Sequence, residues 1–375
     1  MTRKSDNGNP SASSRALASL KTFRIQIDKL DLQILKLVNE RARLAGEIGR
    51  VKFENGGEIF SPAREEEVLQ NVCKENKGPL DDATIRAIYR EIMSGARALQ
   101  KVLKIACLGP EFSYSHLASV ERFGQAVEFS LVGSIPAVFE EVNRGHCDFG
   151  VVPLENSTDG RVADTLDMFM RLPMLKVCAE IRLRIHHNLL ANCEQSEIRR
   201  VYSKGQALGQ CRNWLSKSVP QAAIVEVSST ANAARLAQTE PGAAAVASRQ
   251  AAVRYGLRVL APDIEDYPFN ETRFAVIGHQ ETARTGNDKT AIMFKVSHAP
   301  GTLADALNVF KNNKINLTWI ESFPSRAAKP EYVFFADFEG HTEDPKSKKT
   351  LNALAEHCEK VTVLGSFPQA PLSND

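Results

Sequence analysis

The first part of the chain carries the apolar repeat of one long helix. Between Leu20 and Lys52, apolar residues recur at alternating steps of four and three, and no proline interrupts them. This repeat predicts a helix that ends near Phe53 and packs against other helices through a seam. The seam consists of Phe23, Ile27, Leu30, Ile34, Leu37, Leu44, Ile48 and Val51. A seam this long on a small unit predicts an intertwined dimer.

Two cations lie on the seam face. Arg41 stands where the repeat expects an apolar residue, and Lys52 follows three helical turns later on nearly the same face. Because a buried guanidinium needs an anion beside it, the pair suggests a pocket for a small polyanion. The alternative is that Arg41 pairs with Glu40 or Glu47 and that Lys52 reaches solvent.

Two shorter helices are predicted after the first, over about 62–76 and 81–101. Ser61-Pro62 has the residue types of an N-cap and a first helical position, and Asn55-Gly56-Gly57 separates this helix from the first. In the third helix, Gln100 follows the apolar stripe, so its amide is expected to point inward. The three helices make a unit of about 90 residues.

At Lys104 the pattern changes to alternating strands and helices. This alternation predicts an α/β domain with a parallel sheet, in which ligands bind at loops after strands. The predicted strands are 104–108, 127–132, 149–152, 185–191, 223–227, 244–247 and 272–277, and the predicted helices are 115–123, 135–143, 207–216 and 231–238. Two polar loops, 155–160 and 270–273, are candidate ligand sites, although ordinary turn chemistry explains such loops as well.

The C-terminal part predicts a βαββαβ unit, which is ferredoxin-like. The expected organisation is therefore a disordered tail at 1–14, a helical domain at 15–103, an α/β domain at 104–281, a linker at 282–289, a small α+β domain at 290–368 and a tail at 369–375.

Composition narrows the class of protein. Lys+Arg 47 against Asp+Glu 45 leaves the chain nearly neutral, and no basic stripe supports nucleic-acid binding. The seven cysteines are scattered and odd in number, which favours reduced thiols in a cytoplasmic protein over disulfides or zinc ligands. No segment predicts a membrane span or a signal peptide.

Motifs in all three parts carry a resemblance to one family. In the first part they are Phe23-Arg24, Glu40-Arg41, Ile48-Gly49, Lys52 and Pro62-Ala63-Arg64-Glu65. In the middle they are Gly109-Pro110-Glu111, Ser115-His116, Val152 to Thr158, Ser229-Thr230-Ala231 and Asn270 to Phe274. In the tail they are Pro300-Gly301, Ile315-Asn316-Leu317 and Ile320-Glu321-Ser322.

Over about residues 20–368, the chain resembles the bifunctional chorismate mutase–prephenate dehydratases of phenylalanine synthesis. The resemblance implies a multidomain fold: an all-α chorismate mutase that forms an intertwined dimer, a two-lobed α/β dehydratase domain like the periplasmic binding proteins, and a ferredoxin-like ACT domain. It implies the small-molecule substrates chorismate and prephenate, L-phenylalanine as an effector, and no metal or organic cofactor.

The first implied reaction is the rearrangement of chorismate to prephenate, which needs a compact conformer and donors at the ether oxygen. The resemblance assigns one substrate carboxylate to Arg41, the ether oxygen to Lys52 and Gln100, and the ring hydroxyl to Glu65. It gives Arg24 a role in the partner chain's site, Arg64 a supporting ionic role, and Ser61 a peripheral contact.

The second implied reaction is loss of CO2 and water from prephenate, in which the departing hydroxide needs a proton donor. The resemblance assigns this donor to Thr272, a carboxylate anchor to Arg273 and packing to Phe274. Four more residues are expected to line the cleft: Ser115, Asn156, Ser157 and Thr158. The family's usual Ser-His-Pro-Gln is Ser203-Lys204-Gly205-Gln206 here, and the added cation leaves the amino-bearing relative arogenate open as a substrate.

In the tail, the resemblance implies a phenylalanine site built from Pro300, Gly301, Thr302 and Leu303 together with Glu321 and Ser322. Phe323 stands where the family has arginine, which leaves the feedback response open. Two other readings compete. A dehydrogenase would need a GxGxxG turn, which the sequence lacks, and a non-catalytic amino-acid sensor would have no use for the mutase residues. We expect His116, His186 and His187 to have hydrogen-bonded structural roles.

Overall fold

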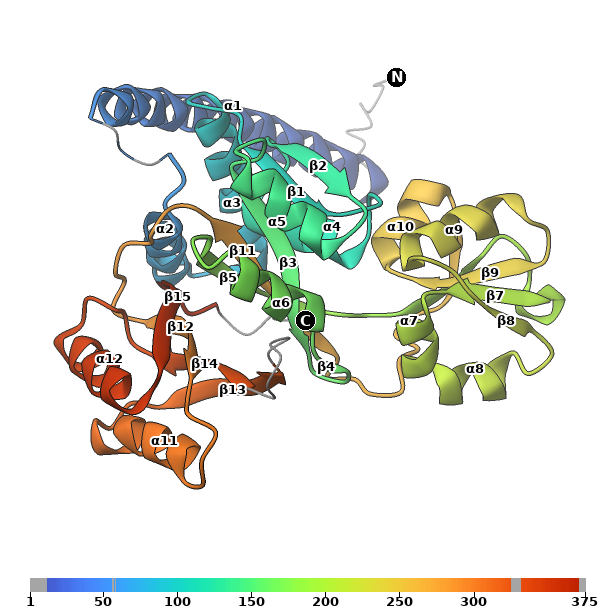
Figure 1. Ribbon diagram of the computed structural model, residues 1–375. Coiled ribbons are helices and arrows are strands. Elements are labelled where there is room, and N and C mark those ends of the chain that lie inside the picture. The colour runs from blue at the N-terminus through green and yellow to red at the C-terminus, as the bar shows by residue number, and fades with distance from the viewer. Residues whose placement is uncertain (1–11, 56, 58, 325–331, 371–375) are drawn as a thin grey trace, which may run out of the picture.

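The computed structural model describes residues 12–55, 57, 59–324 and 332–370 (Figure 1). Three helices form the N-terminal unit: α1 (Ala12–Glu54), α2 (Pro62–Glu75) and α3 (Asp82–Ala98). Of the predicted disordered tail, residues 1–11 lie outside the described residues, whereas 12–14 belong to α1. The Ser61 side chain caps α2 by accepting a hydrogen bond from the Arg64 N–H, and that of Asp81 caps α3 by accepting from Thr84.

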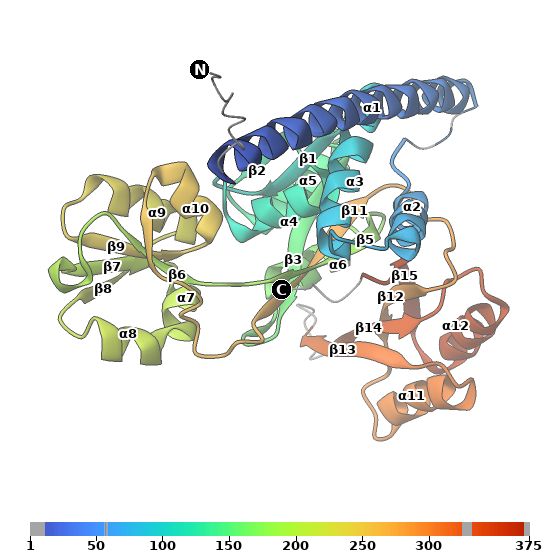
Figure 2. The ribbon, with the colours of Figure 1, turned by 180° about the vertical axis from the view of Figure 1, so that it is seen from behind.

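The long helix α1 leaves its apolar seam open. It packs on α3 and lies as an extended rod over the α/β domain (Figures 1 and 2). The seam side chains are half or more exposed, from Leu44 at 50% to Leu37 at 64%. A row of exposed apolar side chains this long is typical of a surface that contacts another protein.

The first lobe of the α/β domain is built on a mixed sheet. Its main strand order is β2-β1-β3-β11-β5, with β4 paired to β3. The strands are β1 (Lys104–Leu108), β2 (Glu128–Val132), β3 (Phe149–Asn156), β4 (Gly160–Arg161), β5 (Lys176–Arg184) and β11 (Glu271–Gly278), and the helices are α4 (Tyr114–Phe123), α5 (Ile135–Asn143) and α6 (Ala163–Arg171). The prediction of a parallel sheet is wrong in one respect, because β11 runs antiparallel to both β3 and β5.

The second lobe holds a sheet of order β10-β6-β9-β7-β8. Its strands are β6 (Asn188–Ala191), β7 (Arg200–Ser203), β8 (Ala223–Glu226), β9 (Ala243–Ala247) and β10 (Arg258–Ala261), and its helices are η1 (Gln195–Glu197), α7 (Gly205–Gln210), α8 (Arg212–Ser218), α9 (Thr230–Thr239) and α10 (Arg249–Tyr255). The helix predicted over 207–216 is in fact the pair α7 and α8. The chain crosses between the lobes at 185–187 and 262–270.

The C-terminal domain follows the predicted βαββαβ order. Its elements are β12 (Asp288–Lys295), α11 (Thr302–Asn312), β13 (Leu317–Pro324), β14 (Tyr332–Glu339), α12 (Pro345–His357) and β15 (Lys360–Pro368). The antiparallel strand order is β13-β14-β12-β15. This domain shares a hydrophobic core with the first lobe, because Phe335 and Phe367 belong to the same buried cluster as Val152 and Val177. The two domains therefore pack as one body.

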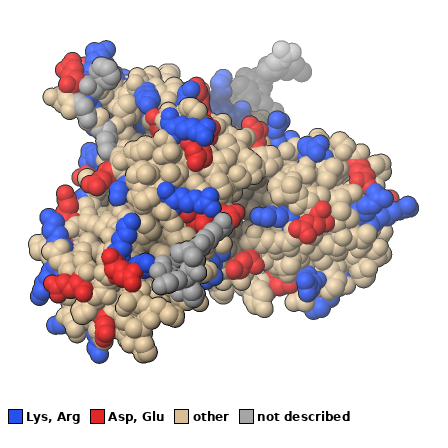
Figure 3. Space-filling view, in the orientation of Figure 1, with Lys and Arg blue, Asp and Glu red and all other residues tan. Residues whose placement is uncertain are grey.

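Figure 3 shows lysine and arginine side chains interspersed with aspartate and glutamate on the face that it draws, without a large field of one sign. Among the described residues, no helix is long and apolar enough to span a membrane.

Candidate active sites

A cleft of about 670 Å³ lies between the two lobes of the α/β domain. Side chains of both lobes line it, including Ser115, Asn156 and Thr272 of the first lobe and Lys204 of the second. Because each wall belongs to a different lobe, one ligand bound here can contact both lobes.

Thr272 and Asn156 meet in this cleft, as the motifs predict. The Asn156 amide donates to Thr272 Oγ1 over 2.8 Å and to Asn270 Oδ1 over 3.0 Å. Its carbonyl oxygen accepts from the backbone N–H and the hydroxyl of Thr158, at 3.0 and 2.6 Å. Asn156 is only 5% exposed, so its orientation is fixed and it holds the Thr272 hydroxyl in one place.

Gln210 of α7 links the two lobes, a role that the sequence analysis missed. Its amide nitrogen donates to Thr158 Oγ1 over 2.5 Å and to Asp159 over 2.7 Å. Its oxygen accepts from Asn270 over 2.8 Å and lies 2.8 Å from His187 Nε2. The sequence does hint at this role, because Gln210 follows Gln206 by one helical turn, which puts both side-chain amides on one face of a short helix.

Two helix N-termini open into the cleft. Ser113 caps α4 and lines the cavity with Ser115, while Ser229 caps α9 and lines it with Thr230. Helix N-termini present backbone N–H groups and a partial positive charge, which favour a carboxylate. These hydroxyl-rich ends suit an anionic ligand.

The buried histidines near the cleft are hydrogen-bonded, as expected. His187 is 2% exposed, and burial lowers its pKa. His116 accepts a hydrogen bond from the Phe112 N–H over 3.2 Å, and burial lowers its pKa too. Both imidazoles are therefore neutral at physiological pH.

Ser157 and Thr158 stabilise the loop and do not line the cavity. The Ser157 hydroxyl donates to the Phe269 carbonyl over 3.0 Å and accepts from the Glu271 N–H over 2.9 Å. The Thr158 hydroxyl donates to the Asn156 side-chain oxygen and accepts from the Gln210 amide. Both residues act on the cleft through other side chains.

Arg273 is not where the sequence analysis expects it. Neighbouring side chains on a strand point to opposite faces, so Thr272 and Phe274 line the cleft while Arg273 points away from it. Its guanidinium pairs with Glu180 of β5 and with Asp337 of β14 in the C-terminal domain. Burial opposes ionisation of Glu180, but Arg273 and Lys289 outweigh it and lower the pKa of that carboxyl. The predicted role of carboxylate anchor in the cleft is therefore wrong for Arg273.

The predicted mutase residues are distributed over two sites in the single chain. The Gln100 amide donates to the Ala45 carbonyl of α1 over 3.0 Å, and Gln100 lines a surface cavity of about 450 Å³ between α1 and the end of α3. A Cβ at Gly49 would clash with the Gln100 side chain, so this placement of Gln100 depends on the glycine. Arg41 and Lys52 are half-buried on the same helix.

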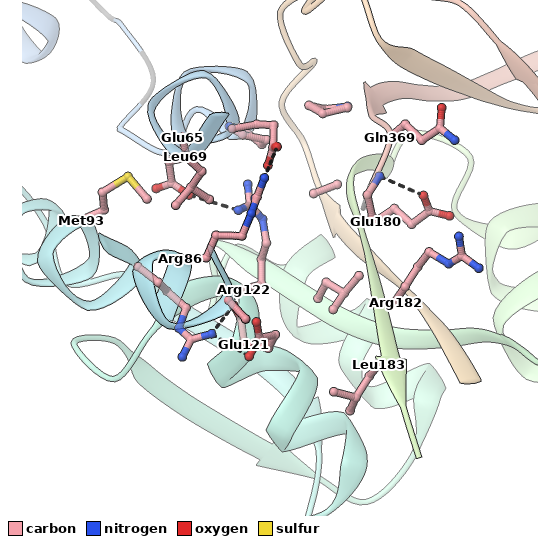
Figure 4. A pocket seen from close by; sticks show the side chains of 18 of the residues that line it. Glu65, Leu69, Arg86, Met93, Glu121, Arg122, Glu180, Arg182, Leu183 and Gln369 are labelled. Carbon is pink, nitrogen blue, oxygen red and sulfur yellow. Dashed lines mark hydrogen bonds and ion pairs between the residues drawn. The ribbon is translucent and has the colours of Figure 1, made fainter. Parts of the chain in front are cut away.

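Glu65 lies elsewhere, in a cavity of about 390 Å³ where the three domains meet (Figure 4). Its carboxylate pairs with Arg97 of α3 and, at 3.3 Å, with Arg122 of α4. Arg97 also donates to the Phe123 carbonyl over 2.6 Å. Arg64 pairs with Glu67 at the surface, and Arg24 is exposed on α1. The single chain therefore does not bring Glu65 to Gln100.

The C-terminal domain carries a separate cavity of about 480 Å³. Gly301, Thr302 and Leu303 line it at the start of α11, whereas Pro300, Glu321 and Ser322 do not. Gly301 has a φ of 90°, a conformation that favours glycine. Glu321 instead faces the α/β domain, where it pairs with Arg161 over 3.0 Å.

One group of side chains has the residue types of a metal site. His186 Nδ1, Asp263 and Glu265 place their polar atoms within 4.8 Å of one another at the crossing between the lobes. Glu265 is occupied in the present arrangement, because it pairs with His186 over 2.9 Å and accepts from the His187 N–H over 2.9 Å. Hydrogen bonds thus account for the cluster.

The fold and the cleft define a multidomain enzyme, in which a helical unit precedes a two-lobed α/β domain with a hydroxyl-lined cleft. A prephenate dehydratase family model matches residues 105–282, and a type II chorismate mutase model matches residues 23–101. The bifunctional chorismate mutase/prephenate dehydratase of Pseudomonas aeruginosa is 44% identical over 94% of this chain and 98% of its own length. That of Aquifex aeolicus is 42% identical over 95% of this chain and 99% of its own length.

Among solved structures, a prephenate dehydratase from Arthrobacter aurescens in complex with L-Phe aligns with a TM-score of 0.66 and 31% identity. The alignment covers 72% of this chain and 93% of that one. The chain belongs to the bifunctional chorismate mutase/prephenate dehydratase family. It is an enzyme with two activities, an isomerase joined to a lyase.

Proposed function

We propose that the cleft binds prephenate and converts it to phenylpyruvate, with Thr272 as the donor to the departing hydroxide. The observation that carries this role is the hydrogen bond from the Asn156 amide to Thr272 Oγ1. An amide N–H can only donate, so the threonine oxygen accepts and its own hydrogen is directed elsewhere. In the cleft, that hydrogen faces the substrate. Aromatisation of the ring drives the loss of CO2 and water, so a well-placed donor is sufficient.

The other cleft residues support substrate binding in this proposal. Ser115 and the N-termini of α4 and α9 supply donors for carboxylate oxygens. Phe274 lines the cleft beside a buried apolar cluster of the first lobe, and Ser157 and Thr158 hold the loop that carries Asn156. The related acid arogenate carries an ammonium group in place of the ketone. Assays of the dehydratase with each of the two acids show which one the enzyme prefers.

We propose further that the helical unit rearranges chorismate to prephenate as an intertwined homodimer. The exposed seam of α1 supports the dimer, because a second copy would cover it. In that dimer Arg41, Lys52 and Gln100 line the pocket, and the partner's Arg24 completes it. Ser61 and Arg64 lie at its edge. Glu65 lies in a separate cavity of the single chain, so its contact with the substrate's ring hydroxyl needs another position of α2 in the dimer.

The C-terminal domain is proposed to be an ACT domain that binds L-phenylalanine and lowers dehydratase activity. Its βαββαβ order and the cavity beside Gly301 and Thr302 support this assignment. The dehydratase of Arthrobacter aurescens, which was solved with L-Phe, supports the same ligand. All seven cysteines are free, which is compatible with the cytoplasm as the proposed location.

One experiment tests both activities. Purified protein is incubated with chorismate, and the ultraviolet absorbance of phenylpyruvate is followed over time. We expect phenylpyruvate from the native protein and accumulation of prephenate from Thr272→Val. A protein that releases no prephenate and no phenylpyruvate would contradict the proposal and favour an amino-acid sensor. Repeating the assay with millimolar phenylalanine tests the feedback response.

A further inference from the structure

Four side chains beside the dehydratase cleft form a closed ring of hydrogen bonds. The Gln210 amide donates to Thr158 Oγ1 over 2.5 Å, and the Thr158 hydroxyl donates to Asn156 Oδ1 over 2.6 Å. The Asn156 amide donates to Asn270 Oδ1 over 3.0 Å, and the Asn270 amide donates to Gln210 Oε1 over 2.8 Å. Each member therefore accepts from one neighbour and donates to the other, so that the bonds polarise and strengthen one another.

The backbone sets the direction of this ring. Asn156 Oδ1 also accepts from the backbone N–H groups of Thr158 and Asp159, at 3.0 and 3.2 Å. Because an N–H can only donate, the oxygen of Asn156 lies on this side and its nitrogen faces Asn270. The same reasoning then orients the amides of Asn270 and Gln210. These three amide residues are at most 8% exposed, so solvent does not replace a lost partner.

The ring connects the second lobe to the proposed proton donor. Gln210 lies on α7 of the second lobe, and Asn156 lies on β3 of the first. The Asn156 amide also donates to Thr272 Oγ1 over 2.8 Å. The backbone carbonyl of Glu271 lies 3.3 Å from the same nitrogen, so the amide has another acceptor to turn toward when Asn270 is displaced. Gln210 thus acts on both ends of the Asn156 side chain through its two neighbours in the ring.

We propose that Gln210 is a positioning residue for dehydration, which orients the Thr272 hydroxyl through the ring. Because the ring needs a side chain from each lobe, the donor is oriented when the two lobes are together around the substrate. This inference rests on prephenate dehydration as the function of the cleft and on Thr272 as the donor. Gln210 holds other side chains in place, and proton donation stays with Thr272.

The test uses the full-length enzyme with prephenate as the added substrate, and measures kcat and KM separately from pH 6 to 8.5. Gln210→Met keeps the length of the side chain and removes the amide. Its kcat should fall about tenfold or more, because a misplaced donor loses rate, while KM stays within about threefold. The ratio of its kcat to that of the native enzyme should not change with pH.

Gln210→Glu should have a kcat that recovers on acidification. An ionised carboxylate only accepts, so it takes the Thr158 hydrogen and breaks the ring, whereas a protonated carboxyl has one donor and one acceptor, as the ring requires. The groups that face this position are the Asp159 carboxylate, at 2.7 Å, and the neutral imidazole of His187, at 2.8 Å. Burial beside Asp159 should raise the pKa of the new carboxyl. The kcat relative to the native enzyme should therefore rise severalfold from pH 8.5 to pH 6.

The matched control is Gln206→Glu. Gln206 lines the same wall of the cleft one helical turn earlier and also donates to Asp159, over 2.5 Å, but it is outside the ring. The added charge should raise KM for the dianionic substrate, while kcat stays within about twofold of the native value at each pH. This variant separates the effect of charge in the cleft from the effect of breaking the ring.

The acid recovery of kcat in Gln210→Glu is the decisive result, provided that its unfolding midpoint lies above the assay temperature at each pH. A protein that is only less stable gains no rate per folded molecule when the pH falls. A native kcat in Gln210→Met, or the same pH profile of kcat in Gln210→Glu and Gln206→Glu, would overturn the inference while native turnover of prephenate stands. A native enzyme that does not turn over prephenate would instead contradict the function of the cleft.

Discussion

The Asn156 amide donates a hydrogen bond of 2.8 Å to Thr272 Oγ1. Asn156 lies on β3 and Thr272 on the adjacent antiparallel strand β11, where the register places the two residues opposite each other. The proposed donor hydroxyl is thus oriented by a direct cross-strand neighbour. The pairing is possible only because β11 returns from the second lobe to the middle of the first sheet.

We expect Asn156→Asp to lower the dehydratase kcat by about a hundredfold with the fold intact. A carboxylate can only accept, so it would draw the Thr272 hydrogen away from the departing hydroxide. Phenylpyruvate formation from prephenate measures the effect. Asn352→Asp, at an exposed position of α12, is the matched control and should behave as the native protein. Native turnover in Asn156→Asp would show that the donor is oriented by another group.

Lys52→Ala should lower the mutase kcat/KM by a factor of about 10² to 10³, because it removes a donor from the oxygen on which negative charge develops. The dehydratase, assayed with prephenate added directly, should be unaffected because its cleft lies in another domain. Lys21→Ala, which changes an exposed lysine of the same helix, is the control. If Lys52→Ala keeps native mutase activity, the cationic pocket on α1 has no part in the rearrangement.

Leu37→Glu should convert the protein to monomers and abolish the mutase activity. Leu37 is 64% exposed in the single chain and lies in the middle of the seam, where a partner helix would bury it. A carboxylate buried there costs several kcal/mol, and the seam also loses the apolar contacts of Leu37. Light scattering gives the oligomeric state, and Lys36→Glu, one position away on the outer face, is the control. A dimer that survives Leu37→Glu would mean that the subunits associate through another surface.

The apolar repeat predicted the seam because that signal is local, whereas the expectation for Thr272 came from the family resemblance of its motif. A heptad-like repeat specifies one face of a helix such as α1, wherever that helix lies in the fold. The Asn270 to Phe274 motif marks the start of strand β11. Arg273 was misplaced because its partner Asp337 is 64 residues away in another domain, which no local pattern reveals. The strand β5 was missed because it is buried over most of its length and shows no alternation, so its residues carry no period of two.

The Arg273–Asp337 pair leads to a prediction about stability. Asp337 is 1% exposed, so Asp337→Asn leaves a buried guanidinium with only Glu180 as its ionic partner. Removing one partner of a buried pair typically costs about 3–5 kcal/mol. We expect a clearly lower thermal unfolding midpoint and slower dehydration, because Thr272 adjoins Arg273. Glu140→Gln, which breaks an exposed pair with Arg144, should cost less than about 1 kcal/mol. Equal midpoints for the two variants would contradict this view of the interface.

His187 makes stability depend on pH in a predictable direction. Burial holds its pKa below the ordinary value of 6.5, so the unfolded chain binds a proton at a pH where the folded protein does not. The free energy of unfolding should therefore fall as the pH decreases below about 6.5, and it should be independent of this group at higher pH. Unfolding midpoints measured from pH 5 to 8 give the slope. His187→Gln should make that slope shallower, whereas His357→Gln, at an exposed position, should leave it unchanged. An unchanged slope in His187→Gln would assign the acid sensitivity to other groups.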